Sequence, residues 1–153
     1  MRLSTNPPKY VVEIAAGLKK RYLDFDHYNL KDPLDELLFI ICSTKTEEAS
    51  YRNSFRALKG SFPTHNTIAT ADAGRIARAI VSGGLSNLKA KAIRNLLDAV
   101  VARFREPSLE SLRSMDDDEA EEFLVSLPGV GKKIARCVLM YSLDRKVFPV
   151  DTT

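Results

Sequence analysis

The chain has 153 residues, 44% of them apolar, and a formal net charge of +3 at pH 7. This length and apolar content predict one domain with a single sizeable core. The mildly basic charge permits nucleic-acid binding without indicating it. No apolar run is long enough to cross a membrane, and the polar start MRLSTNPPKY lacks the apolar segment of a signal peptide. We therefore expect an intracellular protein of the cytoplasm or nucleoid, with no membrane partner.

The two cysteines, Cys42 and Cys137, lie far apart in the sequence, each in an apolar helical context. This placement is typical of buried free thiols in a reducing compartment and disfavours a disulfide or a metal pair. We therefore expect no iron–sulfur cluster and no other cofactor built on cysteine.

Apolar residues recur at helical spacing along the whole chain, and no segment alternates with the period of two that marks a half-buried strand. In chain order the expected helices are 8–22, 34–42, one that carries Tyr51 to Leu58, 71–81, a long one from the Gly83-Gly84 turn to Pro107, a short helix or turn at 108–115, 119–126, and one that opens at Gly131. We expect Asp32 and the segment 46–48 to cap helices. The acidic run 116–119 resembles a metal site, but its position at a helix N-terminus favours a cap there too. The pattern predicts an all-α fold.

A short segment near the C-terminus, Leu127-Pro128-Gly129-Val130-Gly131-Lys132-Lys133-Ile134-Ala135, predicts a tight hairpin between two helices. The glycines leave backbone amides uncovered at a helix N-terminus, where a DNA phosphate can bind without contact to the bases. A Walker nucleotide loop requires a four-residue gap between its glycines and a preceding strand, and neither is present. A plain helix pair ended by glycine is the structural alternative.

The segment 127–135 resembles the helix-hairpin-helix motif of the endonuclease III-like DNA glycosylase superfamily. In that family a loop with glycine or proline and a catalytic aspartate follows the motif, and here residues 147–152 resemble this loop, with Asp151 as the aspartate. The separation between Lys133 and Asp151 also matches that of endonuclease III-type enzymes. The resemblance begins at about Asp32 and extends to the chain end.

The resemblance implies a single domain of the helix-hairpin-helix and Gly-Pro-Asp type over residues 1–153. Residues 1–31 correspond to the N-terminal helix and loop of a second lobe, and residues 32–153 form the helical domain with the hairpin at 125–135. The family continues beyond the Asp-Thr pair with a further helix and often an iron–sulfur loop, whereas this sequence ends at Thr153. We therefore expect an incomplete second lobe, with Val11, Ile14, Ala15 and Leu18 on an apolar helix face that favours self-association or a partner completing this lobe.

The resemblance also implies base-excision repair chemistry on double-stranded DNA that carries a damaged or modified base or an abasic site. Lys133 would be the nucleophile at C1′, and Asp151 would accept its proton or stabilise the sugar cation. A covalently attached lysine acidifies the C2′ proton, so the 3′ phosphate can leave by β-elimination. The implied activity is therefore that of a DNA glycosylase with AP lyase activity.

Further residues correspond to DNA-contacting positions of the family. They are Lys45 at the place of a glutamine inserted into the base stack, Asn87 and Lys89 in a segment similar to GL-x-N-x-KA, and the hairpin residues Gly129, Gly131 and Lys132. The carbonyls of Val125, Leu127 and Val130 would hold a monovalent cation that bridges the hairpin to phosphate. Residues 148–152 and Cys137-Val138 are also similar to plant 5-methylcytosine glycosylases, whereas the general pattern suits enzymes for oxidised pyrimidines.

Three functions stay open from the sequence. The first is the glycosylase and AP lyase, complete or as a catalytically impaired truncated form. The second is a non-enzymatic helix-hairpin-helix module that binds DNA. The third is an all-α protein that serves only as a structural partner of another chain.

Overall fold

The computed structural model describes residues 6–23 and 29–150, and all regular structure within these ranges is helical. The elements are α1 (Lys9–Arg21), α2 (Pro33–Ser43), α3 (Glu48–Ser61), α4 (His65–Ala69), α5 (Ala73–Ala79), the 3₁₀ helix η1 (Val81–Gly83), α6 (Ser86–Phe104), the 3₁₀ helix η2 (Glu110–Ser114), α7 (Asp117–Ser126) and α8 (Lys132–Leu143). The predicted all-α class is confirmed. None of the helices in the described part of the chain is long and apolar enough to span a membrane.

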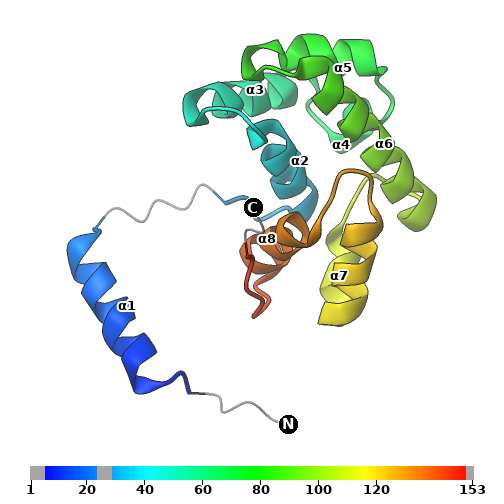
Figure 1. Ribbon diagram of the computed structural model, residues 1–153. Coiled ribbons are helices and arrows are strands. Elements are labelled where there is room, and N and C mark those ends of the chain that lie inside the picture. The colour runs from blue at the N-terminus through cyan, green and yellow to red at the C-terminus, as the bar shows by residue number, and fades with distance from the viewer. Residues whose placement is uncertain (1–5, 24–28, 151–153) are drawn as a thin grey trace.

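Helix α2 lies at the centre of the core. The Asp32 carboxylate accepts the N–H groups of Leu34 and Asp35, each at 2.9 Å, and Pro33 occupies the first turn, so the predicted cap is confirmed. The helix packs against α3, α6 and α8. Its leucines at 34, 37 and 38 are fully buried, each worth about 1.5–3 kcal/mol of apolar transfer. Figure 1 shows α3 to α6 on one side of α2 and the α7–α8 pair on the other.

The start of α3 differs from the prediction. Its N-cap residue is Glu47, whose side chain makes no capping bond. The Thr46 hydroxyl, expected to contribute to this cap, donates instead to the Gly83 carbonyl at 2.7 Å. The short helix α4 was also not predicted, and it begins with a reciprocal capping box between Thr64 and Thr67.

Two sets of hydrogen bonds stabilise α7 and the segment after α8. The Asp116 carboxylate caps α7 through the Glu119 N–H at 2.8 Å, as predicted for the acidic run. After α8, the Arg145 guanidinium donates to the carbonyls of Leu112, Arg113 and Met115 and to the Asp117 carboxylate. The segment after α8 is therefore fixed to the residues just before and at the start of α7.

Helix α1 lies away from the other helices (Figure 1), and none of its residues is buried. The apolar face predicted for it is open to solvent, with Ile14 58% and Leu18 49% exposed. The helix itself matches its predicted bounds within one residue at each end. The assignment of residues 1–31 to a second lobe stays a prediction.

Candidate active site and nucleic-acid interface

The predicted hairpin joins α7 to α8. The Val130 N–H donates to the Leu127 carbonyl at 3.1 Å and closes the turn, and Leu127 and Val130 are both buried. Gly129 has φ +81°, a left-handed conformation that an L side chain adopts only with strain. Gly131 is the N-cap of α8 with an ordinary φ of −92° and no capping side chain. The first amide groups of α8 are therefore not capped by a side chain, and they lie beside the exposed surface of Pro128 and Gly129.

Lys132 and Lys133 form the first turn of α8, and both side chains are exposed. Lys133 shares one face of the helix with Cys137 and Tyr141, since they are spaced four residues apart. Burial raises the pKa of the Cys137 thiol, which the nearby Lys133 charge lowers and the Glu36 charge raises. Burial likewise raises the pKa of Tyr141. The charges of Lys133 and Glu36 thus both act on the thiol and the phenol of this face. Asp151 lies outside the described residues.

The carbonyls expected as cation ligands belong to the last turn of α7, at Val125, and to the hairpin that follows it, at Leu127 and Val130. The Leu127 carbonyl already accepts the Val130 N–H, but a carbonyl oxygen has a second lone pair. Three neutral carbonyls supply the hard oxygen ligands that suit an alkali cation without adding charge. The residues present at 125, 127 and 130 are thus chemically compatible with a monovalent ion.

Two further loops reach the surface beside the hairpin. The first follows α2, and at its tip Lys45 is exposed with φ +51°. The second precedes α6, where Gly84 has φ +65° and Leu85 has φ +51°. Leu85 is 51% exposed and Leu88, one turn later, is 67% exposed. An exposed apolar side chain at such a tip can enter a base step, a feature that the sequence analysis missed. Its signal in the sequence was a leucine directly after two glycines.

The three loops surround one cavity of about 240 Å³. Its wall consists of Ile41, Thr44, Lys45, Leu85, Leu88, Lys89, Ala92, Pro128, Gly129 and Ile134. The structure therefore brings Lys45 and Gly129, 84 positions apart in the sequence, to one place. Asn87 is exposed in the first turn of α6, next to the wall residue Leu88 in the sequence, and its side chain is available to a ligand. Gly131 and Lys132 follow Gly129 directly.

Lys89 departs from its predicted role. It was expected to contact DNA, but the residue is 5% exposed and its ammonium group is bonded inside the protein. It donates to the Cys42 carbonyl at 2.7 Å, the Thr46 hydroxyl at 2.5 Å and the Gly83 carbonyl at 3.1 Å. A lysine ammonium has three donors, and these bonds use them all. Lys89 therefore has no donor left for phosphate, and the prediction is wrong.

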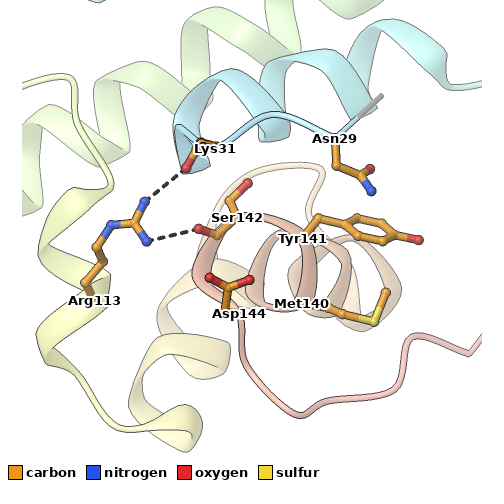
Figure 2. Close-up of a pocket in the computed structure, with 7 residues that line it drawn as sticks. All are labelled: Asn29, Lys31, Arg113, Met140, Tyr141, Ser142 and Asp144. Atoms are coloured by element: carbon orange, nitrogen blue, oxygen red, sulfur yellow. Dashed lines mark hydrogen bonds between the residues drawn. The ribbon is translucent and has the colours of Figure 1, made fainter. Parts of the chain in front are cut away.

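A larger hollow of about 500 Å³ lies at the C-terminal end of α8 (Figure 2). Asn29, Met140 and Tyr141 line it, and the Arg113 guanidinium donates to the carbonyls of Lys31 and Ser142 at 3.0 Å each. Tyr141 is eight residues beyond Lys133 on the same face of α8, or about 12 Å along the helix. This hollow therefore lies two helical turns beyond Lys133.

One group of side chains has metal-ligand geometry, formed by Asp32, Asp35 and His65. The Asp35 carboxylate accepts the Lys59 ammonium at 2.8 Å and contacts His65 Nε2 at 2.7 Å. Burial raises the pKa of Asp35, but the hydrogen bonds from His65 and Lys59 outweigh it, and the pKa is lowered overall. Since Asp32 caps α2 and Asp35 is neutralised by Lys59, this group stabilises the fold as an ion-pair network.

The fold and the hairpin define a helix-hairpin-helix protein of the DNA glycosylase type. No family model matches the chain. A candidate DNA glycosylase of Arabidopsis thaliana is 37% identical over 119 residues, which cover 78% of this chain and 41% of the relative. The DNA glycosylase/AP lyase ROS1 of the same plant is 38% identical over 85 residues, 56% of this chain and 6% of that protein. Among solved structures, a trapped endonuclease III–DNA covalent intermediate has a TM-score of 0.72 at 22% identity, over 97% of this chain and 66% of that one.

The chain belongs to the endonuclease III-like, helix-hairpin-helix superfamily of DNA glycosylases. It spans less than half the length of the two plant relatives and about two thirds of the endonuclease III chain.

Proposed function

We propose that this chain carries base-excision activity as a DNA glycosylase with AP lyase activity. The observation that carries the proposal is the place of Lys133, exposed in the first turn of α8 directly after the glycine turn. A positive helix end disfavours the charged form of a lysine there and so favours the neutral amine that a nucleophile requires. The name of the ROS1 relative, which contains both activities, supports the same chemistry.

The reaction begins when the damaged nucleotide leaves the base stack. The Lys133 amine attacks C1′, the N-glycosidic bond breaks, and the base leaves with the bonding electron pair and takes up a proton. Asp151 accepts the proton that the lysine loses or stabilises the sugar cation. The sugar ring then opens to give a Schiff base between Lys133 and C1′. Removal of a C2′ proton expels the 3′ phosphate by β-elimination, which leaves a strand break.

The rest of the interface binds the duplex. The uncapped amides at Gly131 and the amine of Lys132 suit backbone phosphates, and Gly129 permits their close approach. Lys45 lies on the loop after α2 and Asn87 in the first turn of α6, with Leu85 as the apolar side chain suited to fill the place of an extruded base. A monovalent cation on the carbonyls of Val125, Leu127 and Val130 would add positive charge beside the phosphate.

Borohydride trapping on a duplex with an abasic site tests the proposal. Lys133→Gln should abolish the covalent adduct and leave the DNA affinity within severalfold, because one charge is a small part of many phosphate contacts. Lys132→Gln is the matched control, which should weaken binding but still form the adduct at saturating DNA. An adduct with Lys133→Gln would show that another residue is the nucleophile. DNA binding by the unmodified chain without any adduct would favour the non-enzymatic DNA-binding module.

A second role is supported by the open apolar face of α1. We propose that this face mediates self-association or contact with a partner chain, because side chains such as Ile14 and Leu18 are half exposed on an otherwise uncovered helix. Sedimentation should show a mass that rises with protein concentration, and Ile14→Asp should remove this dependence. A monomer at all concentrations would contradict self-association.

A further inference from the structure

Lys89 connects the two loops that lie beside the hairpin. Cys42 and Thr46, which accept two of its hydrogen bonds, flank the Lys45 tip on either side. Gly83, which accepts the third, directly precedes the Gly84-Leu85 tip. The ammonium group of Lys89, a residue of α6, therefore forms hydrogen bonds to residues beside the tips of both loops.

Thr46 closes this network. Its hydroxyl accepts the Lys89 N–H at 2.5 Å and donates to the Gly83 carbonyl at 2.7 Å. Since a hydroxyl has one proton and two lone pairs, both bonds can exist at once. The first loop is thus bonded to the second directly as well as through Lys89.

The backbone at the tips of both loops adopts an unfavourable conformation. Lys45 and Leu85 both have φ +51°, in the left-handed region that non-glycine residues adopt only when the surrounding structure holds them there. The two tips are exposed and lie on the wall of the same cavity as the hairpin residue Gly129. Their relative position therefore depends on the bonds below them.

A buried ammonium group is an uncommon way to fill this space. Burial lowers the pKa of Lys89, although the Cys42 thiol opposes the shift, and an apolar side chain of similar length would avoid this desolvation. What an apolar side chain cannot supply is three directed bonds to two separate loops. The charge is thus better explained by the geometry that it imposes than by stability.

On the basis of the proposed function, we propose that Lys89 is a positioning residue for base extrusion. It holds the Lys45 and Leu85 tips at the separation needed to enter a DNA duplex, and it takes no part in the covalent chemistry at Lys133. The substrate class that depends on Lys89 is therefore duplex DNA with a stacked base. Single-stranded abasic DNA has no base to extrude and does not depend on it.

The test compares Lys89→Met with the unmodified chain on two substrates under single-turnover conditions. Borohydride trapping on single-stranded abasic DNA should proceed within about twofold of the unmodified rate. On a duplex with 2-aminopurine at the target position, the fluorescence rise that reports extrusion should fall about tenfold or more, since misplacing a positioned group by 1 Å can cost about a hundredfold. Lys91→Met, at an exposed lysine two positions along α6, is the matched control and should leave extrusion unchanged.

A second pair of variants tests the same network even if Lys89→Met fails to fold. Thr46→Val removes the hydroxyl from the network and should lower extrusion, whereas Thr46→Ser retains the hydroxyl and should restore it. Equal losses on the single-stranded and duplex substrates, or full extrusion by Thr46→Val, would overturn the proposal. If the unmodified chain extrudes the base without trapping and Lys89→Met does not extrude it, the lyase chemistry of Lys133 is refuted and the role of Lys89 is supported.

Discussion

Two glycines of this chain should respond to the same substitution with opposite signs. A Cβ atom added at the buried Gly83 would lie 2.4 Å from Ser54 Oγ and 3.1 Å from Ser54 Cβ. The Ser54 hydroxyl is held by the Ile80 carbonyl and the Ser82 hydroxyl, so it is not free to turn away. Overpacking of this kind costs about 1–3 kcal/mol. The smaller unfolded-state entropy of alanine returns about 0.4–1 kcal/mol, so Gly83→Ala should lower the free energy of unfolding by about 1–2 kcal/mol.

Gly60 provides the contrast. It lies in α3 with no atom within 4 Å of an added Cβ, and its φ is not in the left-handed region. Replacing a helix glycine with alanine stabilises by about 0.5–1 kcal/mol. For a chain of this length 1 kcal/mol corresponds to about 2–4 °C in Tm. Thermal unfolding followed by circular dichroism should therefore show a lower Tm for Gly83→Ala and a higher Tm for Gly60→Ala.

The Ser54→Ala background isolates the clash. This change removes the closest atom, Ser54 Oγ, although it also loses hydrogen bonds worth about 1 kcal/mol. Within this background Gly83→Ala should cost clearly less than it does in the unmodified chain, and the difference is the coupling between the two sites. The reasoning fails if the cost is the same in both backgrounds, or if Gly83→Ala is as stable as the unmodified chain.

Two further predictions concern the hairpin and the core. Gly129→Ala places a side chain at φ +81° and should weaken binding to unrelated DNA duplexes equally, as measured by fluorescence anisotropy. Gly131→Ala should weaken DNA binding in the same way but cost less folding stability, because the φ of Gly131 is ordinary. Weaker binding to one DNA sequence only would argue against backbone recognition. Burial raises the pKa of Glu36, despite the bond from the Leu30 N–H, so the ionised form is disfavoured in the folded state. Glu36→Gln should therefore raise the free energy of unfolding at pH 7. This gain should shrink as the pH falls through the raised folded-state pKa of Glu36, and it should be absent below roughly 4, where Glu36 is protonated in the folded and unfolded states. Urea titrations at pH 7 and below this limit check it, and an equal gain at both would exclude the carboxylate charge as its cause.

The features that the sequence predicted well depend on near neighbours. Asp32 and Asp116 cap their helices through amides two or three positions along the chain. The hairpin follows from glycines within a five-residue turn, and the helix bounds follow from apolar periodicity. Each of these signals is complete within one or two helical turns, so no knowledge of the tertiary structure is required to interpret it.

The features that the sequence did not reveal depend on distant partners. The bonds from Lys89 to Cys42 and Thr46 join residues 47 and 43 positions apart. In the sequence Lys89 and Lys91 look equivalent, yet one is buried and the other exposed because α6 turns only one of them toward α2. Thr46 likewise resembled a helix cap in the sequence, because the carbonyl that accepts its hydroxyl proton belongs to the distant Gly83. Local patterns cannot distinguish these cases.

The bonds of Arg145 have a consequence for how the hairpin comes apart. Helices α7 and α8 are joined covalently at the glycine turn, and Arg145 ties the segment after α8 to the other end of α7 through Asp117 and nearby carbonyls. These bonds disfavour fraying of either helix from a free end. We therefore expect the pair to open as one cooperative unit, with amide protons along both helices exchanging with solvent through a shared event.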